Sequence, residues 1–202
     1  MLRKYAAALA VTILAVATAH AERLEDVQRR LSVNHNIVTE FIQQKEVKGM
    51  PIPLITKGTA VISKDFGVYW KQTMPFPMEF VVTDRFISQK MPGKKKRIID
   101  KNSNHRLFQY ASLLKSVTAY DYKALEGSFD VDFKSTGNKT WEISLRPLTE
   151  PLAKAFTHIL IGGGDYLEEV VVADGKGDVT AVKFYNQQKI DQAAQVRGFF
   201  ER

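Results

Sequence analysis

The sequence predicts an α+β fold, an incomplete (half-open) antiparallel β-barrel of about ten to eleven strands with helices covering its concave face. Three observations indicate this fold: short β-favouring segments follow one another between turn signals, an amphipathic helix precedes them, and a helical segment interrupts them midway. No internal repeat or low-complexity linker divides residues 22–202. We therefore expect a single domain over that range.

The N-terminal segment has the pattern of a secretory signal peptide. Residues 3–4 (Arg-Lys) form a basic start, residues 5–18 are almost uninterruptedly apolar, and residues 19–21 (Ala-His-Ala) form a small-x-small cleavage site. We expect cleavage after Ala21 and a periplasmic location for the rest of the chain. The alternative is an uncleaved membrane anchor, but the apolar run is shorter than the roughly 20 residues that span a bilayer.

The first predicted elements are a helix and a series of strands. Residues 22–33 are predicted to form an amphipathic helix, because Leu24, Val27 and Leu31 recur at spacings of three and four. From Val38 onward the apolar period changes to two, which predicts strands. These strands are expected over residues 39–47, 59–63, 67–73, 79–83, 86–91 and 97–100.

A helical period returns in the middle of the chain. Over residues 105–117, Leu107, Tyr110, Leu114 and Val117 share one helical face. Shorter helical turns are predicted over residues 120–125 and 151–156, the second with a proline at the first helical position. Further strands are expected over residues 129–133, 141–145, 158–161, 166–173 and 179–186, and the tail from residue 187 fits strand, helix or irregular structure.

The composition restricts the chemistry that is available. The chain has no Cys, which excludes disulfides and a thiol nucleophile, and its formal charge is +7. Part of the positive excess lies in Lys94, Lys95, Lys96 and Arg97, directly after a Pro-Gly pair. Such a run at a hairpin tip is either a solvated turn that protects an edge strand or a surface that faces a membrane or a protein partner. We expect no nucleic-acid partner for an exported protein.

No catalytic or metal-binding pattern stands out in the sequence. His35, His105 and His158 have no partner at metal-ligand spacing, and there is no Gly-x-Ser-x-Gly elbow. The glycines at 162–164 lack the Lys-Ser/Thr pair of a phosphate-binding loop. A Ser-His-Asp site assembled in space stays open, because triads do not depend on sequence order. We expect no enzymatic activity, no cofactor and no metal ion.

Several short motifs follow the order of a known family. They are Phe41-x-Gln43 after the opening helix, Gly58 at the start of the next strand, GVYW at 67–70 followed by Pro75, VVTD at 81–84, and a late strand over 141–147. In these motifs, and in the order of its elements over essentially the whole of residues 22–202, the chain resembles the LolA superfamily of periplasmic lipoprotein carriers. The resemblance implies an incomplete β-barrel with a helical lid over an apolar cavity that receives acyl chains.

Two departures indicate a LolA-related branch rather than the lipoprotein carrier itself. Lys64 stands where the carrier pattern has an arginine that helps to hold the lid closed, and a lysine does not provide the forked hydrogen bonds of an arginine. Residues 86–104 also differ from the carrier pattern. Lipoprotein is therefore not established as the cargo.

These observations predict a monomeric carrier that binds the acyl chains of a lipid or lipoprotein and transfers them across the envelope, with inner- or outer-membrane proteins as partners. The alternative is an envelope protein-interaction or lipid-sensing module with the same fold and no transport. A strongly curved sheet has more concave surface than its own side chains fill, which favours a ligand cavity. The residues expected to line it are Phe41, Trp70, Phe80, Val82, Phe129, Val131, Phe133, Trp141 and Ile143. The residues expected in the lid are Leu107, Tyr110 and Leu114.

An apolar connection between two predicted strands calls for a separate interpretation. Met50, Ile52 and Leu54 alternate there with Pro51 and Pro53, which hold the connection extended. We expect these three apolar residues and the basic run at 94–97 to lie at the rim of the barrel, in contact with a lipid or a partner protein. The alternative is a long loop packed against the helices.

Overall fold

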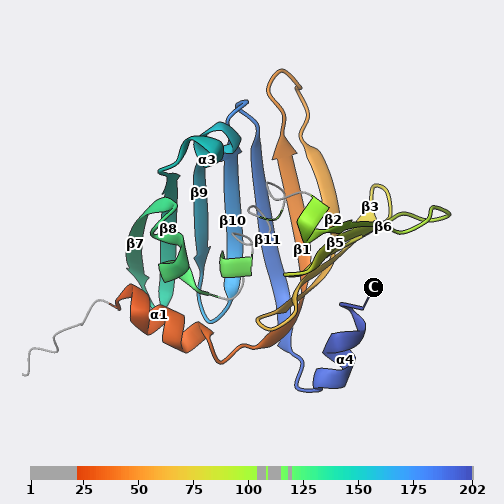
Figure 1. Cartoon of the computed structure of the whole chain (residues 1–202). Helices are drawn as coiled ribbons and strands as arrows, with labels where there is room; N and C mark the ends of the chain where they lie inside the picture. Colours follow the sequence, from red (N-terminus) through yellow and green to blue (C-terminus); the bar gives the residue numbers. More distant parts are fainter. Residues whose placement is uncertain (1–21, 104–107, 109–114, 118–119, 202) are drawn as a thin grey trace, which may run out of the picture.

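The chain forms one antiparallel sheet of eleven strands in the order β6-β5-β4-β3-β2-β1-β11-β10-β9-β8-β7 (Figure 1). The computed structural model describes residues 22–103, 108, 115–117 and 120–201. The strands are β1 (Asn36–Glu46), β2 (Leu54–Ser63), β3 (Gly67–Met74), β4 (Met78–Val82), β5 (Phe86–Lys90), β6 (Arg97–Asp100), β7 (Phe129–Gly137), β8 (Thr140–Pro147), β9 (Phe156–Gly163), β10 (Leu167–Asp174) and β11 (Val179–Lys189). The helical elements whose bounds lie in the described part are α1 (Leu24–Leu31), η1 (Lys101–Ser103), η2 (Tyr122–Leu125), α3 (Glu150–Ala155) and α4 (Ala193–Gly198). Phe108 and residues 115–117 are helical as well.

The first and last strands pair at the centre of the sheet. β1 lies antiparallel to β11, with Phe41 opposite Phe184, and so joins β2–β6 to β7–β10. β6 and β7 are the two edges, and the sheet does not close. β3–β6 lie at a steep angle to β7–β11, so that the sheet curls (Figure 1). The predicted α+β fold with a half-open antiparallel barrel is therefore confirmed.

The strand register divides the side chains between two faces of the sheet. Directly opposed residues point to the same face, as do alternate residues along one strand. On one side of β1 the register leads from Phe41 to Trp70 and Phe80. On the other side it leads through Phe184 to Ile143. We call the face that carries these residues the inner face and the opposite one the outer face.

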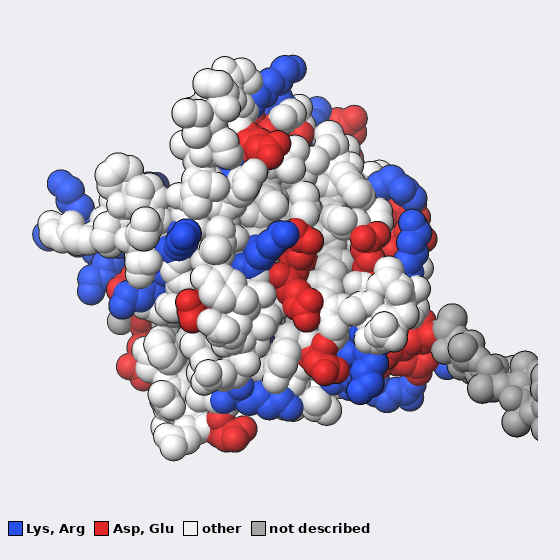
Figure 2. Space-filling model, turned by 180° about the vertical axis from the view of Figure 1, so that it is seen from behind, with Lys and Arg blue, Asp and Glu red and all other residues white. Residues whose placement is uncertain are grey.

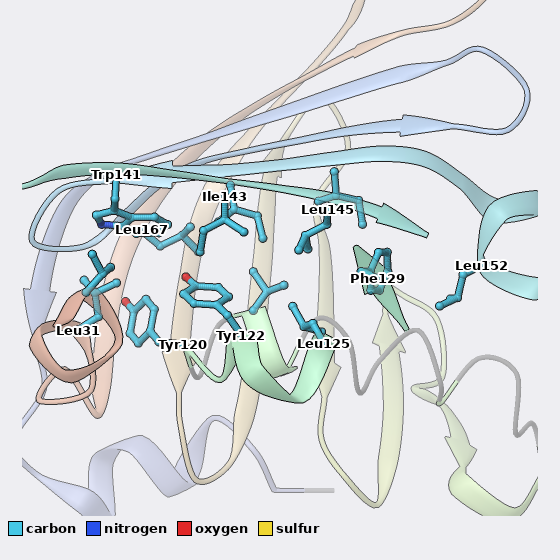
Figure 3. Packing of buried hydrophobic residues seen from close by; sticks show 14 residues of the cluster. Leu31, Tyr120, Tyr122, Leu125, Phe129, Trp141, Ile143, Leu145, Leu152 and Leu167 are labelled. Atoms are coloured by element: carbon cyan, nitrogen blue, oxygen red, sulfur yellow. The ribbon is translucent and has the colours of Figure 1, made fainter. Parts of the chain in front are cut away.

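Helix α1 and the turn η2 pack on the inner face of β7–β10 (Figure 3). The predicted apolar stripe of α1 is confirmed, because Val27 and Leu31 are fully buried. Tyr122 and Leu125 of η2 join them against Trp141. Burying each such aliphatic side chain contributes roughly 1.5–3 kcal/mol relative to its exposed state. This cluster is the larger of the two cores formed by described residues.

A second core lies on the outer face, beneath α4. Val196 and Phe200 of the C-terminal segment pack with Val61, Val81 and Phe86 of the sheet. The sequence predicts that the helices cover the concave face, but α4 lies on the opposite, outer face. Val196 and Phe200 are four residues apart, as on one face of a helix. A single pair at this spacing is too little to predict a helix from sequence.

Strand β2 begins earlier than predicted. Leu54 and Ile55 pair with Lys45 and Gln44 of β1, so the apolar connection ends before them and the predicted start at Gly58 is wrong. A β-branched residue at 55 and a full ladder to β1 favour the strand over the loop. Gly58 instead lies inside β2 at a register shift against β3, where a Cβ atom would overlap the carbonyl oxygen of Lys71.

Candidate functional site

All the residues predicted to line the cavity lie on the inner face. The residue pairs that link these positions across neighbouring strands are in regular register. Residues that alternate along one strand therefore share a face with their partners on the next strand. The residues are Phe41, Trp70, Phe80, Val82, Phe129, Val131, Phe133, Trp141 and Ile143. They fall into two groups with different surroundings, one on β7 and β8 and one on β1, β3 and β4.

The group on β7 and β8 belongs to the packed core under α1 and η2. Phe129, Trp141 and Ile143 are buried there, and Val131 and Phe133 pack against them while partly exposed. Figure 3 shows Trp141, Ile143 and Phe129 pointing from the sheet toward Tyr122 and Leu125. These residues therefore form the floor of the core on this half of the sheet.

The group on β1, β3 and β4 forms an aromatic surface with less cover. The ring of Phe41 is fully buried and stacks on Trp70, with the centroids 3.6 Å apart. The rings of Trp70 and Phe184 lie with their centroids 6.2 Å apart, in a T-shaped arrangement that aromatic rings favour. Trp70, Phe80, Val82 and Phe184 are each only partly buried. We call these four residues the aromatic patch.

Phe184 was not among the predicted site residues. It lies directly opposite Phe41 across the β1–β11 ladder, which only the long-range pairing of the first and last strands reveals. The alternation of Val182 with Phe184 in the sequence was the one local signal, and it did not identify the partner strand.

The predicted lid residues Leu107, Tyr110 and Leu114 lie outside the described residues. Of the predicted helix over residues 105–117, Phe108 and residues 115–117 are described and helical. Phe108 and Val117 are buried, and Val117 belongs to the core under α1.

Arg30, rather than Lys64, ties a helix to the sheet. The Arg30 guanidinium donates to the carbonyl oxygens of Gly164 at 2.7 Å and Lys139 at 2.8 Å, and pairs with Glu22 at 3.0 Å. The hydrogen bonds to the Glu22 carboxylate raise the pKa of Arg30 above its ordinary value. Lys64 is exposed beside a polar hollow of about 560 Å³ next to α1, and has no ion-pair partner among the described residues.

The predicted rim residues are exposed. The exposed fractions of Met50, Ile52 and Leu54 are 50%, 73% and 49%, so the alternative of a loop packed against the helices is wrong. The basic run at 94–97 is also exposed, in the β5–β6 connection and the first residue of β6. Both segments lie at the end of the sheet where β1 and β5 finish.

The described residues contain no group of three or more His, Asp or Glu side chains that could hold a metal ion. The one Ser-His contact that the described part provides joins Ser144 and His158 at 2.8 Å. Their strand positions place both side chains on the outer face, away from the aromatic patch. His105 lies outside the described residues.

Comparisons with known proteins return similar folds. No protein-family model and no curated protein matches the chain. A LolA superfamily protein from Nitrosomonas europaea matches with a TM-score of 0.49 and 6% identity, over 89% of this chain and 97% of that one. A DUF1329 family protein from Desulfovibrio piger matches with a TM-score of 0.46 and 10% identity, over 89% and 96% of the two chains. The MucA/MucB complex of Pseudomonas aeruginosa matches with a TM-score of 0.43 and 14% identity, over 86% of this chain and 60% of that one. The first of these structures carries the name of the superfamily that the sequence resembles.

None of the helices formed by described residues is both long and apolar enough to cross a bilayer.

Proposed function

We propose that the protein is a non-enzymatic periplasmic carrier that binds the acyl chains of a lipid or lipoprotein on the inner face of its sheet. The observation that supports it is the aromatic patch. Trp70, Phe80, Val82 and Phe184 present large apolar groups that the described residues cover only in part, beside the fully buried Phe41. Acyl chains suit such a surface, because it offers mainly apolar contact.

The burial of an acyl chain can supply enough free energy for reversible binding. Burying one CH₂ group is worth about 0.8 kcal/mol, so a sixteen-carbon chain gains on the order of 12 kcal/mol before the costs of binding. A carrier also has to release its cargo. A surface made of flat rings, which a flexible chain contacts without close interlocking, favours release over permanent binding.

Titration with a fluorescent fatty acid tests the proposal. We expect saturable binding by the wild type and a rise in its melting temperature when the fatty acid is present, because only the folded state binds. Phe80→Ser should weaken binding by about tenfold or more, since it removes a large apolar contact. Ile42→Ser is the matched control, because Ile42 is a neighbour of Phe41 in sequence but lies on the outer face.

Two results would count against the carrier. If the wild type does not bind the probe, the interaction or lipid-sensing module becomes the better interpretation of the fold. If Ile42→Ser weakens binding as much as Phe80→Ser, the inner face is not the site. If the wild type binds the probe on the inner face, mass spectrometry of ligand extracted from protein purified from its native periplasm identifies the cargo.

A further inference from the structure

A set of exposed apolar side chains lies at one end of the sheet. It comes from two strand connections, β1–β2 and β3–β4, together with the strand residues next to them. The exposed fractions are highest for Ile52, at 73%, and Phe76, at 77%. The residues of the set, which we call the apolar tips, are Met50, Ile52, Leu54, Ile55, Met74 and Phe76.

The two connections are neighbours in space. Lys57 of β2 lies opposite Met74 of β3, and the Thr73 hydroxyl donates to the Lys57 carbonyl oxygen at 3.1 Å. β2 therefore extends past the end of β3, and the β1–β2 hairpin projects beyond the neighbouring strands (Figure 1). Met74 and Phe76 of the β3–β4 connection are thus exposed beside the base of the projecting β1–β2 hairpin.

Hydrogen bonds hold the tips in their exposed positions. The backbone N–H of Lys48 donates to the Asp178 carboxylate at 3.0 Å, and Lys45 pairs with the same carboxylate at 3.1 Å. In the other connection, the Gln72 side chain donates to the Phe76 carbonyl oxygen at 2.8 Å. Because the loops are braced, their apolar side chains lose little conformational freedom when they enter another phase.

A basic hairpin flanks the tips. The β5–β6 hairpin carries Lys90, Lys94, Lys95, Lys96 and Arg97 and no acidic residue between them. None of these five has an acidic side chain within 4.0 Å among the described residues, although Lys96 donates to the carbonyl oxygen of Glu201. Figure 2 shows blue side chains dominating where this hairpin projects, and a mainly white tip on the β1–β2 hairpin. Apolar tips and unpaired cations thus occur at the same end of the sheet.

We propose that this end of the molecule docks on the surface of an anionic lipid bilayer, with the apolar tips inserted among the acyl chains and the basic hairpin against the headgroups. Exposed apolar side chains on loops at the end of a sheet suit a deformable partner. Unpaired Lys and Arg next to them match a negative surface potential. The proposal concerns the outside of the molecule and does not depend on acyl-chain binding by the aromatic patch.

Vesicle binding tests the proposal directly. We expect the full chain to float with phosphatidylcholine–phosphatidylglycerol vesicles, and to float much less with phosphatidylcholine vesicles or at high salt. The double variant Ile52→Ser/Phe76→Ser should lose at least about tenfold in affinity for the anionic vesicles. Val33→Ser is the matched control, because Val33 is 61% exposed but lies at the opposite end, before β1.

The lack of cysteine allows a second readout. A nitrobenzoxadiazole label on Ile52→Cys is the single label in the chain. Its emission should shift to the blue and brighten with anionic vesicles, whereas the same label on Val33→Cys should not change. Charge reversal by Lys94→Glu/Lys95→Glu should remove the preference for phosphatidylglycerol.

Three outcomes would overturn docking on a bilayer. The first is no flotation of the wild type, and the second is equal flotation of Ile52→Ser/Phe76→Ser and Val33→Ser. The third is an unchanged emission of the label at position 52. No flotation together with an unchanged emission would point to a protein partner. Fatty-acid binding, measured on the same variants, should equal that of the wild type. Loss of docking and loss of the proposed carrier activity are therefore distinguishable.

Discussion

The guanidinium of Arg30 and the indole N–H of Trp141 share one acceptor, the carbonyl oxygen of Gly164, at 2.7 and 2.9 Å. Gly164 follows β9, and Arg30 lies in the last turn of α1. The shared carbonyl therefore fixes the helix to the same strand end that positions Trp141. The orientation of α1 over the inner face depends on this contact as well as on its apolar stripe.

Replacing Arg30 with Met should destabilise the fold by about 2 kcal/mol, because hydrogen bonds from a charged donor are lost and the partly buried Glu22 loses its partner. Urea unfolding followed by circular dichroism measures this. Arg29→Met is the control: the Arg29 side chain is 73% exposed and pairs only with Asp26 on its own helix, and we expect a change under about 0.5 kcal/mol. Equal effects of the two substitutions would contradict the role assigned to Arg30.

Tyr122→Phe should leave stability unchanged or raise it by up to about 1–2 kcal/mol. The Tyr122 hydroxyl is buried and has no hydrogen-bond partner among the described residues, so its removal eliminates an uncompensated polar group. The ring and its contact with Trp141, at 5.9 Å, are retained. Tyr120→Phe is the comparison, and it should cost about 1 kcal/mol. Burial raises the pKa of the Tyr120 hydroxyl, but the Leu167 backbone favours its ionised form and lowers the pKa, which places a polar group beside it. A stability loss for Tyr122→Phe would indicate a partner for its hydroxyl.

Alkaline pH should unfold the domain through the same two phenols. Burial raises the pKa of Tyr120 to about 12 and that of Tyr122 well above its ordinary value. In the unfolded chain a tyrosine ionises near pH 10. The stability that the neutral phenols provide is therefore complete below about pH 10 and is lost as pH rises through 12.

Melting temperatures measured from pH 8 to pH 12 should accordingly stay level at first and then fall steeply. Tyr122→Phe should make the fall shallower, because one group that resists ionisation in the fold is gone. A curve for this variant that coincides with the wild type would exclude Tyr122 as a source of the alkaline sensitivity.

Gly58→Ala should destabilise the sheet by roughly 2–4 kcal/mol. A Cβ atom at position 58 would overlap the Lys71 carbonyl oxygen, a backbone atom that can move only if β3 moves with it. Gly127→Ala is the control, since a Cβ there meets no atom within 4 Å. Differential scanning calorimetry of both variants checks this, and similar melting temperatures would show that β2 and β3 can separate without cost.

The sequence was sufficient for most of the strands and for helix α1, but not for their long-range partners. The alternation of Phe129, Val131 and Phe133 predicted both a strand and its buried face, because period two is a local property of an extended chain. The pairing of Phe41 with Phe184 joins residues that no local pattern links. For this reason the aromatic patch was predicted without one of its four members.

The position of the C-terminal helix could not be predicted for a similar reason. Val196 and Phe200 indicate one apolar side of a short helix, but either face of the sheet offers an apolar surface to receive it. The choice of the outer face depends on where β11 ends, and hence on the complete topology. The start of β2 at Leu54 does not follow from the local sequence, because Pro51 and Pro53 favour a loop up to residue 53 but do not specify where pairing with β1 begins.

The pairing of β1 with β11 also has a consequence for how the chain reaches its native state. The two halves of the sheet are joined only through these strands, whose opposed residues, such as Glu40 and Tyr185, are separated by nearly the whole domain. Closing such a long loop costs entropy before any contact compensates for it, and topologies of this kind fold slowly. Until β11 is available, β1 lacks its partner on that side and the sheet cannot be completed. Completion has to wait for the last strand to emerge, so the domain assembles after the whole chain is present and not progressively from its N-terminus.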